Sequence, residues 1–364
     1  MAPRIAVTVE QFWHRVPGGT ARATRGSLGG LLEVGGFDLH GVAARHRPSD
    51  VASAKLPIPV HCFSVPRPAL YESWHRLGLF NVERLLGPVD AIWASAMVVP
   101  PRSAPLVVTV NDVDFLLHPE RLSSRGKAFF PRAWEVTLDR ADLIVCPTQI
   151  VANDVVAHGV DPSRIRVVHL GVDGVPASPD EVLRVRQRYD IPDSFALFVG
   201  TIEPRKNLVG VVAAMQEIDD LPLVVVGPDG WQVEGSDLLA PLGPRVHRLG
   251  FVPEGDLGAI YSAATVFLLP SFAEGFGLPI IESMLQGTPV VTSLGTATEE
   301  VAAGCAVLVE PTDHHDIVRG IRQILDDPES AADLATRGRR RAGELNWRAT
   351  GVGYAAVFDE VLGA

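Results

Sequence analysis

Residues 266–293 read VFLLPSFAEGFGLPIIESMLQGTPVVTS, and this stretch holds one repeat of the pattern that decides the fold. The short apolar run VFLLP is followed by a glycine-rich turn and then by a helical segment. Pro279 suits the first helical position and Gly287 suits the helix end. A second apolar run begins at Val290. Because continuous apolar runs suit strands that are buried on both faces, the stretch predicts a strand, a helix and a second strand of a parallel sheet.

The same alternation of apolar runs and longer helical segments continues along the whole chain. Besides 266–269 and 290–292, the predicted strands are 5–9, 39–43, 91–94, 106–110, 143–146, 165–169, 196–199, 223–226, 246–249 and 306–309. A length of 364 residues accommodates two domains. Strand–helix alternation in both halves therefore predicts the α/β class, with two doubly wound parallel sheets in two Rossmann-like domains.

The predicted domain boundary lies where GVDGVPASPDE, rich in Gly, Pro, Ser and Asp, follows a strand. We expect a first domain over residues 1–172, a linker over 173–190 and a second domain over 191–346. Residues 347–364 form a predicted amphipathic helix, whose apolar side chains need a surface on which to pack.

Composition excludes several classes of protein. Hydrophobic residues make up 47% and charged residues 21%, which favours a folded core over disorder. We find no apolar run of the roughly 18 residues needed to span a bilayer, and no apolar region of a signal peptide. Together with three widely spaced cysteines, this predicts a cytoplasmic protein.

The two halves of the chain differ in charge. Residues 1–172 carry 18 basic and 15 acidic side chains, and residues 173–364 carry 14 and 28, so the net charges are +3 and −14. Two domains with different ligands would show such a contrast. No dense basic stripe is present, so a nucleic-acid partner is not expected.

The strongest chemical signal is the pair of carboxylates in Glu274-Gly-Phe-Gly-Leu-Pro-Ile-Ile-Glu282. Gly275 and Gly277 let the backbone approach a ligand closely at a helix start, where free N–H groups favour anions and sugars. Glu282 in the first helical turn can accept both hydroxyls of a ribose, and Glu274 can hold hydroxyls of a sugar. The alternative interpretation is a purely structural turn with a capping carboxylate. Such a cap does not require two glycines, a proline and two spaced glutamates, so we favour the ligand site.

The second signal is the adjacent pair Arg205 and Lys206, between the predicted strand FALFV and a helix that Asn207 can cap. A diphosphate is the natural partner, because Arg offers a bidentate fork and Lys a point charge. A solvated pair of loop cations is the alternative. Both loops follow the carboxyl ends of strands, where open α/β sheets bind ligands.

The segments RIRVVHLGVD, FVGTIEPRKNL, GFVPEGDLGAIYSAATVFLLPS and EGFGLPIIESMLQGTPVVTS resemble the retaining glycosyltransferases of family 4, also called group 1. The resemblance covers nearly the whole second half and extends back to ADLIVCPTQIVANDV. It implies the GT-B fold, two Rossmann-like domains facing across a cleft, with the terminal helix packed back on the first domain. It also implies transfer of a hexosyl unit, with mannosyl as a guess, from a nucleotide-diphosphate sugar, with retention and without a metal or other cofactor.

The resemblance assigns roles to particular residues. Arg205 and Lys206 would neutralise the leaving diphosphate, Glu282 would bind the ribose, and Glu274 would bind hydroxyls of the donor sugar. Further residues would line the donor: Val252 beside the base, the backbone of Gly275, Phe276, Gly277 and Leu278 along the sugar and phosphate, and Gly18 and Gly19 of the Pro17-Gly18-Gly19 loop near the phosphate and acceptor.

One departure from the family pattern lies on the acceptor side. Members often carry His-Asp in the loop after the strand written VVTV here, whereas this chain has Asn111-Asp112. Asn111 can hydrogen-bond a sugar hydroxyl but cannot titrate near neutral pH, so any imidazole role at this position is lost. We expect Asn111 to act together with Glu274, Arg205 and Lys206. The acceptor would be a glycan, a lipid-linked glycan or a small molecule.

Two further features have competing interpretations. Arg125, Lys127 and Arg132 interleave with Phe129, Phe130 and Trp134, a pattern that suits either core aromatics with solvated cations or contact with the inner face of a membrane. We favour the core interpretation. The pair His314-His315 is not expected to bind a metal, because no carboxylate or cysteine stands at ligand spacing from it.

Two alternative functions stay open from the sequence. A sugar-nucleotide epimerase of the same fold would bind the same donor but would need titrating acid and base groups. A catalytically silent, donor-binding partner subunit would not need the intact Glu, Glu, Arg and Lys set. A nicotinamide dehydrogenase is disfavoured, because no G-x-G-x-x-G follows the first strand.

Overall fold

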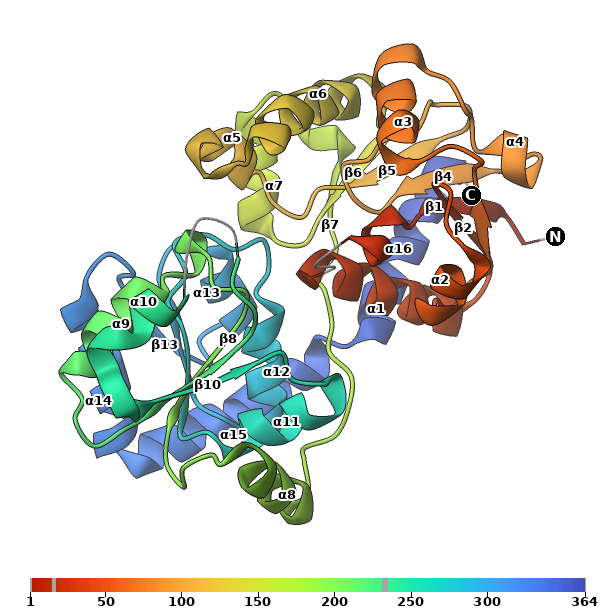
Figure 1. Ribbon diagram of the computed structural model, residues 1–364. Coiled ribbons are helices and arrows are strands. Elements are labelled where there is room, and N and C mark those ends of the chain that lie inside the picture. Colours follow the sequence, from red (N-terminus) through yellow and green to blue (C-terminus); the bar gives the residue numbers. More distant parts are fainter. Residues whose placement is uncertain (1, 15–17, 231–234, 364) are drawn as a thin grey trace. The chain divides into compact units, whose positions relative to one another are not determined.

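A computed structural model of the chain describes residues 2–14, 18–230 and 235–363. The chain divides into two compact units (Figure 1). Unit 1 comprises residues 1–171 and 347–364, and unit 2 comprises residues 172–346. Each is built around one parallel sheet, so the predicted fold class of two doubly wound parallel sheets is confirmed. Pro17, named above with Gly18 and Gly19, lies outside the described residues.

Unit 1 has a seven-stranded sheet in the order β3-β2-β1-β4-β5-β6-β7. Its strands are β1 Arg4–Thr8, β2 Asp38–Ala43, β3 Val60–Cys62, β4 Ala91–Ala94, β5 Leu106–Thr109, β6 Leu143–Cys146 and β7 Ile165–Val167. Its helices are α1 Gly18–Val34, α2 Pro48–Ser53, α3 Arg67–Glu72, α4 Glu83–Leu86, α5 Asp114–Leu117, α6 Ser124–Arg140, α7 Gln149–Ala157 and α16 Trp347–Leu362. All predicted strands of this half are present. The short, half-buried β3 is the one that the sequence analysis missed.

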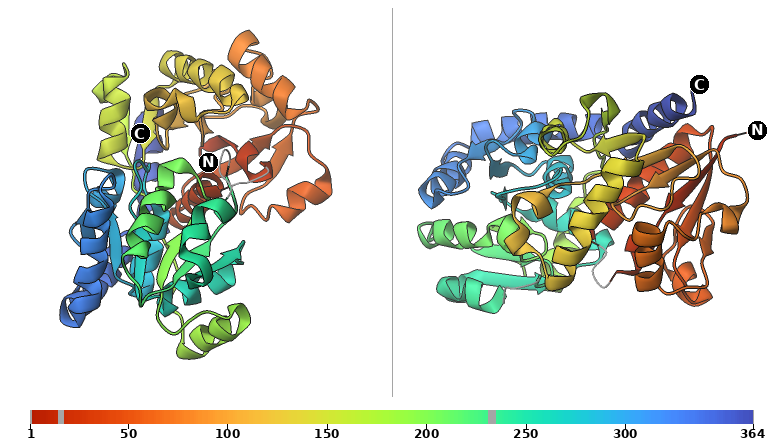
Figure 2. Two further views of the ribbon diagram at one scale, coloured as in Figure 1. Left: turned by 60° about the vertical axis from the view of Figure 1, so that its left-hand side comes forward. Right: turned by 90° about the horizontal axis from the view of Figure 1, so that it is seen from above.

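The side chains of unit 1 alternate between two cores, one on each face of the sheet. Ile5 and Val7 of β1 pack with residues of α1 and α16, whereas Ala6 packs with residues of α6 and α7. This alternation follows from the two-residue period of a strand. Helices therefore cover both faces, as Figure 2 also shows.

The last helix of the chain, α16, packs against α1 of unit 1. Figure 1 shows its blue ribbon beside the red α1. Phe358 of α16 is fully buried and contacts the rings of Trp93 and Phe37. The predicted need of this helix for an apolar surface is met in this way.

Unit 2 has a six-stranded sheet in the order β10-β9-β8-β11-β12-β13. Its strands are β8 Ala196–Val199, β9 Leu223–Val226, β10 Val246–Gly250, β11 Val266–Leu269, β12 Val290–Ser293 and β13 Val307–Val309. Its helices are α8 Pro179–Tyr189, α9 Leu208–Gln216, α10 Gly235–Leu239, α11 Glu254–Ala263, α12 Leu278–Gln286, α13 Ala297–Ala302, α14 His314–Asp326 and α15 Pro328–Glu344. Every strand predicted for this half is present within two residues of its expected ends.

Most of the predicted linker 173–190 is helix α8, which packs on α11. The buried carboxylate of Asp256 in α11 accepts hydrogen bonds from Arg188 (2.8 Å) and the Tyr189 hydroxyl (2.8 Å), and it also pairs with Arg184. Only residues 173–178 of the expected linker are irregular. The Pro- and Ser-rich sequence was read as a linker, whereas Ser178 and Pro179 begin a helix with a capping box. Among the described residues, no helix combines the length and apolarity required to cross a bilayer.

The packing of α16 leads to a stability prediction. Phe358→Ala should lower the free energy of unfolding of unit 1 by about 3–5 kcal/mol, because it removes a fully buried ring and leaves a cavity. Val352→Ala is the control, since Val352 lies on the same helix with about half of its surface exposed. Urea unfolding of both variants measures the difference. Equal losses in the two variants would show that α16 is not part of the core.

Candidate active site

Arg205, Lys206 and Glu274 of unit 2 lie in the loops at the point where the strand order of its sheet reverses. From β8 the chain runs outward to β9 and β10 and then returns to β11 on the other side of β8. The loops that follow β8 and β11 therefore leave neighbouring strands in opposite directions. In open α/β sheets this switch point opens a crevice at the carboxyl ends of the strands, where ligands bind.

The loop after β8 brings Arg205 and Lys206 to this edge. Pro204–Lys206 form one turn of 3₁₀ helix, and Asn207 then adopts a left-handed conformation with φ 56°. The Asn207 side chain accepts a hydrogen bond from the Gly210 N–H (3.1 Å), so its predicted capping of α9 is confirmed. Its amide group donates to the Pro270 carbonyl (3.0 Å), which fixes the loop to the end of β11.

The loop after β11 leads into α12 through Gly277, whose φ of +93° lies in the left-handed region. A Cβ at this position would lie 3.0 Å from the Thr298 methyl group, so a side chain here meets both backbone strain and a neighbour. The side chains of Phe276 and Leu278 are buried. What residues 276–278 present to a ligand is therefore their backbone at the start of α12, as anion and sugar binding at a helix start requires.

Glu274 joins the two loops. Its carboxylate accepts a hydrogen bond from Lys206 Nζ at 2.6 Å and one from Arg205 Nη1 at 3.2 Å. The Ser271 hydroxyl donates a third at 3.3 Å. All three charged side chains are at least three-quarters buried, so little water screens their interaction.

A second carboxylate, Glu203, completes the cluster, although the sequence analysis assigned it no role. Its Oε1 lies 2.9 Å from Arg205 Nη2, and its side chain is buried. The cluster thus holds two cations and two carboxylates and is neutral as a whole. The sequence analysis proposed a diphosphate as partner of Arg205 and Lys206 and did not consider these carboxylates. The position of Glu203 two residues before Arg205 is the feature of the sequence that could have predicted this ion pair.

The cluster keeps Glu274 ionised. Burial by itself would raise the pKa of this carboxyl, but Arg205 and Lys206 outweigh burial and lower the pKa to about 2. Glu274 is therefore a fixed negative charge at neutral pH. It can accept hydrogen bonds from hydroxyl groups but cannot donate a proton.

Glu282 is the fifth residue of α12, just past the first turn in which the sequence analysis expected it, because the helix begins at Leu278. Its side chain is almost completely buried. The Tyr261 hydroxyl donates a hydrogen bond of 3.0 Å to its Oε2. Val252 follows β10, and its side chain is also buried, which leaves its backbone as the part that can face a base. The side chain of the preceding Phe251 is 81% exposed.

The predicted acceptor-side residues belong to unit 1. Gly18 and Gly19 begin α1, and no atom of the described residues, apart from the glycines' own chain neighbours and helix backbone, lies within 4 Å of the Cβ position of either residue. Asn111 follows β5 and lines a small cavity together with Ser27 and Tyr354. These residues lie after β1 and β5, on either side of β4, around the point where the strand order of this sheet reverses.

The aromatic residues of α6 are used in packing. Phe130 stacks on Phe115, Phe129 stacks on His75, and Trp134 is buried. Arg125 and Lys127 are exposed. The preferred interpretation of this segment, core aromatics with solvated cations, is confirmed.

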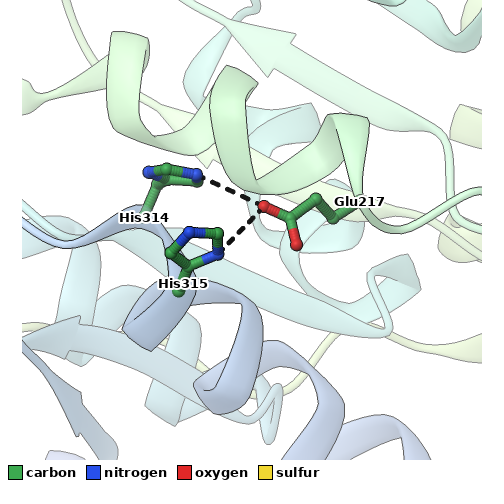
Figure 3. Close-up of side chains that lie close together, drawn as sticks. All are labelled: Glu217, His314 and His315. Carbon is green, nitrogen blue, oxygen red and sulfur yellow. Dashed lines mark ion pairs between the residues drawn. The ribbon is translucent and has the colours of Figure 1, made fainter.

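The fold brings a carboxylate to the histidine pair that spacing along the sequence does not show. Glu217, at the end of α9, lies within 3.3 Å of His314 and His315 at the start of α14 (Figure 3). The carboxylate stands 97 positions earlier in the chain, so spacing along the sequence could not reveal it. The consequences are developed below.

Comparison with known proteins follows the same division of the chain. A family model described as glycosyl transferases group 1 matches residues 182–341, and one described as glycosyltransferase family 4 matches residues 17–174. The chain is 33% identical over 293 residues to the O-antigen chain mannosyltransferase B of Escherichia coli, an alignment covering 74% of this chain and 77% of that protein.

A second relative is an MMP α-(1→4)-mannosyltransferase from Mycolicibacterium hassiacum. It is 32% identical over 218 residues, which cover 56% of this chain and 50% of that protein. Among solved structures, HepE from Anabaena in complex with UDP and glucose superposes with a TM-score of 0.76. The match covers 98% of this chain and 99% of that one at 18% identity, and shows likeness of fold.

The ionised Glu274 predicts a pH dependence of stability. Because its pKa is lowered in the folded state, its stabilising contribution is complete above the unfolded value near 4.5 and is lost as the pH falls towards 2. By pH 3.5 the advantage of the wild type over Glu274→Gln should have shrunk by on the order of 1 kcal/mol. Urea unfolding at pH 7 and pH 3.5 measures this, with the exposed Glu329→Gln as control. An advantage independent of pH would contradict the proposed charge state.

Proposed function

The chain belongs to the group 1 glycosyltransferases of family 4, and from this premise we propose that it is a retaining hexosyltransferase using a nucleoside-diphosphate sugar. The observation that carries the proposal is the position of Arg205, Lys206 and Glu274 at the β8/β11 switch point. Cations at this place suit a diphosphate, and a fixed carboxylate suits sugar hydroxyls.

Departure of the diphosphate is the step that these cations would assist. During transfer the bond between the anomeric carbon and a phosphate oxygen breaks, and the electron pair leaves with the phosphate. Arg205 and Lys206 would stabilise the negative charge that develops there. The backbone N–H groups at the start of α12, after Gly277, add a partial positive charge.

Because the cluster of Arg205, Lys206, Glu203 and Glu274 has no net charge, a bound diphosphate has to compete with carboxylates for the two cations. In the described structure both Arg205 and Lys206 donate hydrogen bonds to Glu274. A diphosphate that binds these cations would therefore share them with Glu274. Lys206 Nζ has three protons, and one of them is directed at Glu274. Glu274 would then turn its remaining lone pairs to hydroxyls of the sugar, while Glu282 holds the ribose. The donor is positioned by groups that are already fixed.

The sugar and acceptor rest on weaker support. Two relatives are named as mannosyltransferases, and this favours a mannosyl donor. Gly18, Gly19 and Asn111 are the residues we assign to the acceptor side, and the acceptor would be a glycan, a lipid-linked glycan or a small molecule. In the described part of the chain, no feature favours an epimerase or a catalytically silent partner subunit.

The function is tested by incubating the protein with GDP-mannose, UDP-glucose, dTDP-glucose and ADP-glucose, after exhaustive chelation and in excess EDTA. We expect transfer from one donor, with the anomeric configuration of that donor preserved in the product, as read by NMR. Arg205 and Lys206 supply the charge that a metal would otherwise supply, so chelation should leave the rate unchanged. An inverted product, or activity that returns only with Mn²⁺ or Mg²⁺, would contradict the proposal.

Removal of either cation should damage transfer. Arg205→Ala and Lys206→Ala should each cost about 2–4 kcal/mol of transition-state stabilisation, measured as kcat/KM. Because each change also leaves a buried carboxylate with one cation fewer, thermal unfolding must show that the variants are folded. The matched control is Arg319→Ala, which removes an arginine paired with Asp316 in α14. Turnover within threefold of the wild type in both cation variants would refute the assignment.

The two carboxylates should fail in different ways. The ribose does not change during transfer, so Glu282→Ala should mainly raise the donor KM. Charge develops at the sugar ring, so Glu274→Ala should mainly lower kcat and leave binding of the free nucleoside diphosphate nearly normal. Steady-state kinetics and calorimetry on both variants separate the two effects. If Glu274→Ala abolished nucleoside diphosphate binding and Glu282→Ala left it intact, the assignment of Glu282 to the ribose and of Glu274 to the sugar would be reversed.

A further inference from the structure

Glu217, His314 and His315 come together outside the proposed donor site. Glu217 directly follows α9, and the two histidines are the first residues of α14, which packs along α9. Glu217 Oε1 lies 3.3 Å from His314 Nε2 and 3.2 Å from His315 Nδ1. Figure 3 shows both rings turned towards the same carboxylate oxygen, so three ligand atoms face a common point.

The three ligand atoms lie within 4.8 Å of one another, and the two separations that involve Glu217 Oε1 are close to those between ligands of one metal ion. Zinc binds nitrogen and carboxylate oxygen at about 2.0–2.2 Å in tetrahedral geometry, which places two ligand atoms roughly 3.3–3.5 Å apart. A charge-assisted hydrogen bond between imidazolium and carboxylate is shorter, about 2.7–2.9 Å. The distances of 3.2 and 3.3 Å lie at or beyond the upper end of the usual hydrogen-bond range and are compatible with two ligands of one ion.

The backbone that carries the histidines is fixed before any ion arrives. The carboxylate of Asp313 caps α14 and accepts a hydrogen bond from the His315 N–H (2.9 Å). The centroids of the two imidazole rings lie 4.1 Å apart, with an angle of 36° between the ring planes. Pre-positioned ligands lose little conformational freedom on binding.

The chemistry of the ligands selects the metal. Two imidazoles and one carboxylate suit divalent metals that bind nitrogen, such as Zn²⁺, whereas Mg²⁺ and Ca²⁺ prefer oxygen ligands alone. The three side chains are 43–70% exposed, so an ion can enter from solvent and water can fill a fourth position. We propose that Glu217, His314 and His315 bind one Zn²⁺ ion, which ties the end of α9 to the start of α14.

The zinc site is distinct from the donor site. Helix α9 begins directly after Asn207 of the donor loop and has nine residues, a length of roughly 13 Å. Asn207 also donates a hydrogen bond to the Pro311 carbonyl (2.7 Å), so the segment before α14 is already fixed to the first residue before α9. The ion would fix the other end of α9 and would take no part in sugar transfer.

Zinc binding is measured on full-length protein without an affinity tag, after chelation and desalting. Titration of Zn²⁺ against a chromophoric chelator should give one ion per chain. His314→Ala, His315→Ala and Glu217→Gln should each weaken that binding at least tenfold. His118→Ala is the matched control, because His118 forms an exposed pair with Glu120 (3.1 Å) but has no second histidine. Its affinity for zinc should stay within twofold of the wild type.

A second measurement uses Co²⁺ in place of Zn²⁺, since a tetrahedral site gives intense visible absorption that adventitious octahedral binding lacks. The absorption should appear in the wild type and in His118→Ala and vanish in His315→Ala. Circular dichroism establishes that each variant is folded. The proposal fails if the wild type takes up no stoichiometric zinc, or if the triple variant of Glu217, His314 and His315 binds as tightly as the wild type. Neither result bears on donor transfer.

Discussion

The contact on which the arrangement of the proposed donor site depends is the one between the Glu274 carboxylate and the two cations Arg205 and Lys206. The cations follow β8 and the carboxylate follows β11, which are neighbouring strands although 68 positions separate Lys206 from Glu274. The ion pairs close the two loops against each other at the switch point of the sheet. Loss of any partner would leave a buried charge with fewer opposite charges beside it, which is destabilising.

The same contact explains how a neutral cluster can serve an anionic ligand. Glu203 and Glu274 balance the two cations, so the side chains can be buried without a donor present. A diphosphate would offer the cations oxygen atoms in place of, or beside, those of Glu274. The exchange of one set of charge-assisted hydrogen bonds for another changes little in the backbone, whose loops are held by Asn207 and by Gly277. Such preorganisation is what makes fixed charges effective in catalysis.

Much of this was predictable from the sequence, because buried parallel strands are continuous apolar runs with turn signals at their ends. Twelve of the thirteen strands were predicted in this way, and β3 was missed because Val60–Cys62 is short and half-buried. The Gly-, Pro- and Ser-rich stretch GVDGVPASPDE was interpreted as a linker followed by a short charged helix, and the linker bounds 173–190 included that helix, which is α8. Salt bridges to Asp256, which a sequence pattern does not show, pair α8 with α11. The partnership of Glu217 with His314 and His315 was invisible, because only folding brings α9 beside α14.

The most direct test of the account is a crystal structure of the protein with its nucleoside diphosphate bound. The account predicts that phosphate oxygens lie about 3 Å from the Arg205 guanidinium and from Lys206 Nζ, at the loops that follow β8 and β11. It also predicts the ribose beside Glu282. A diphosphate bound away from both cations would contradict the central claim.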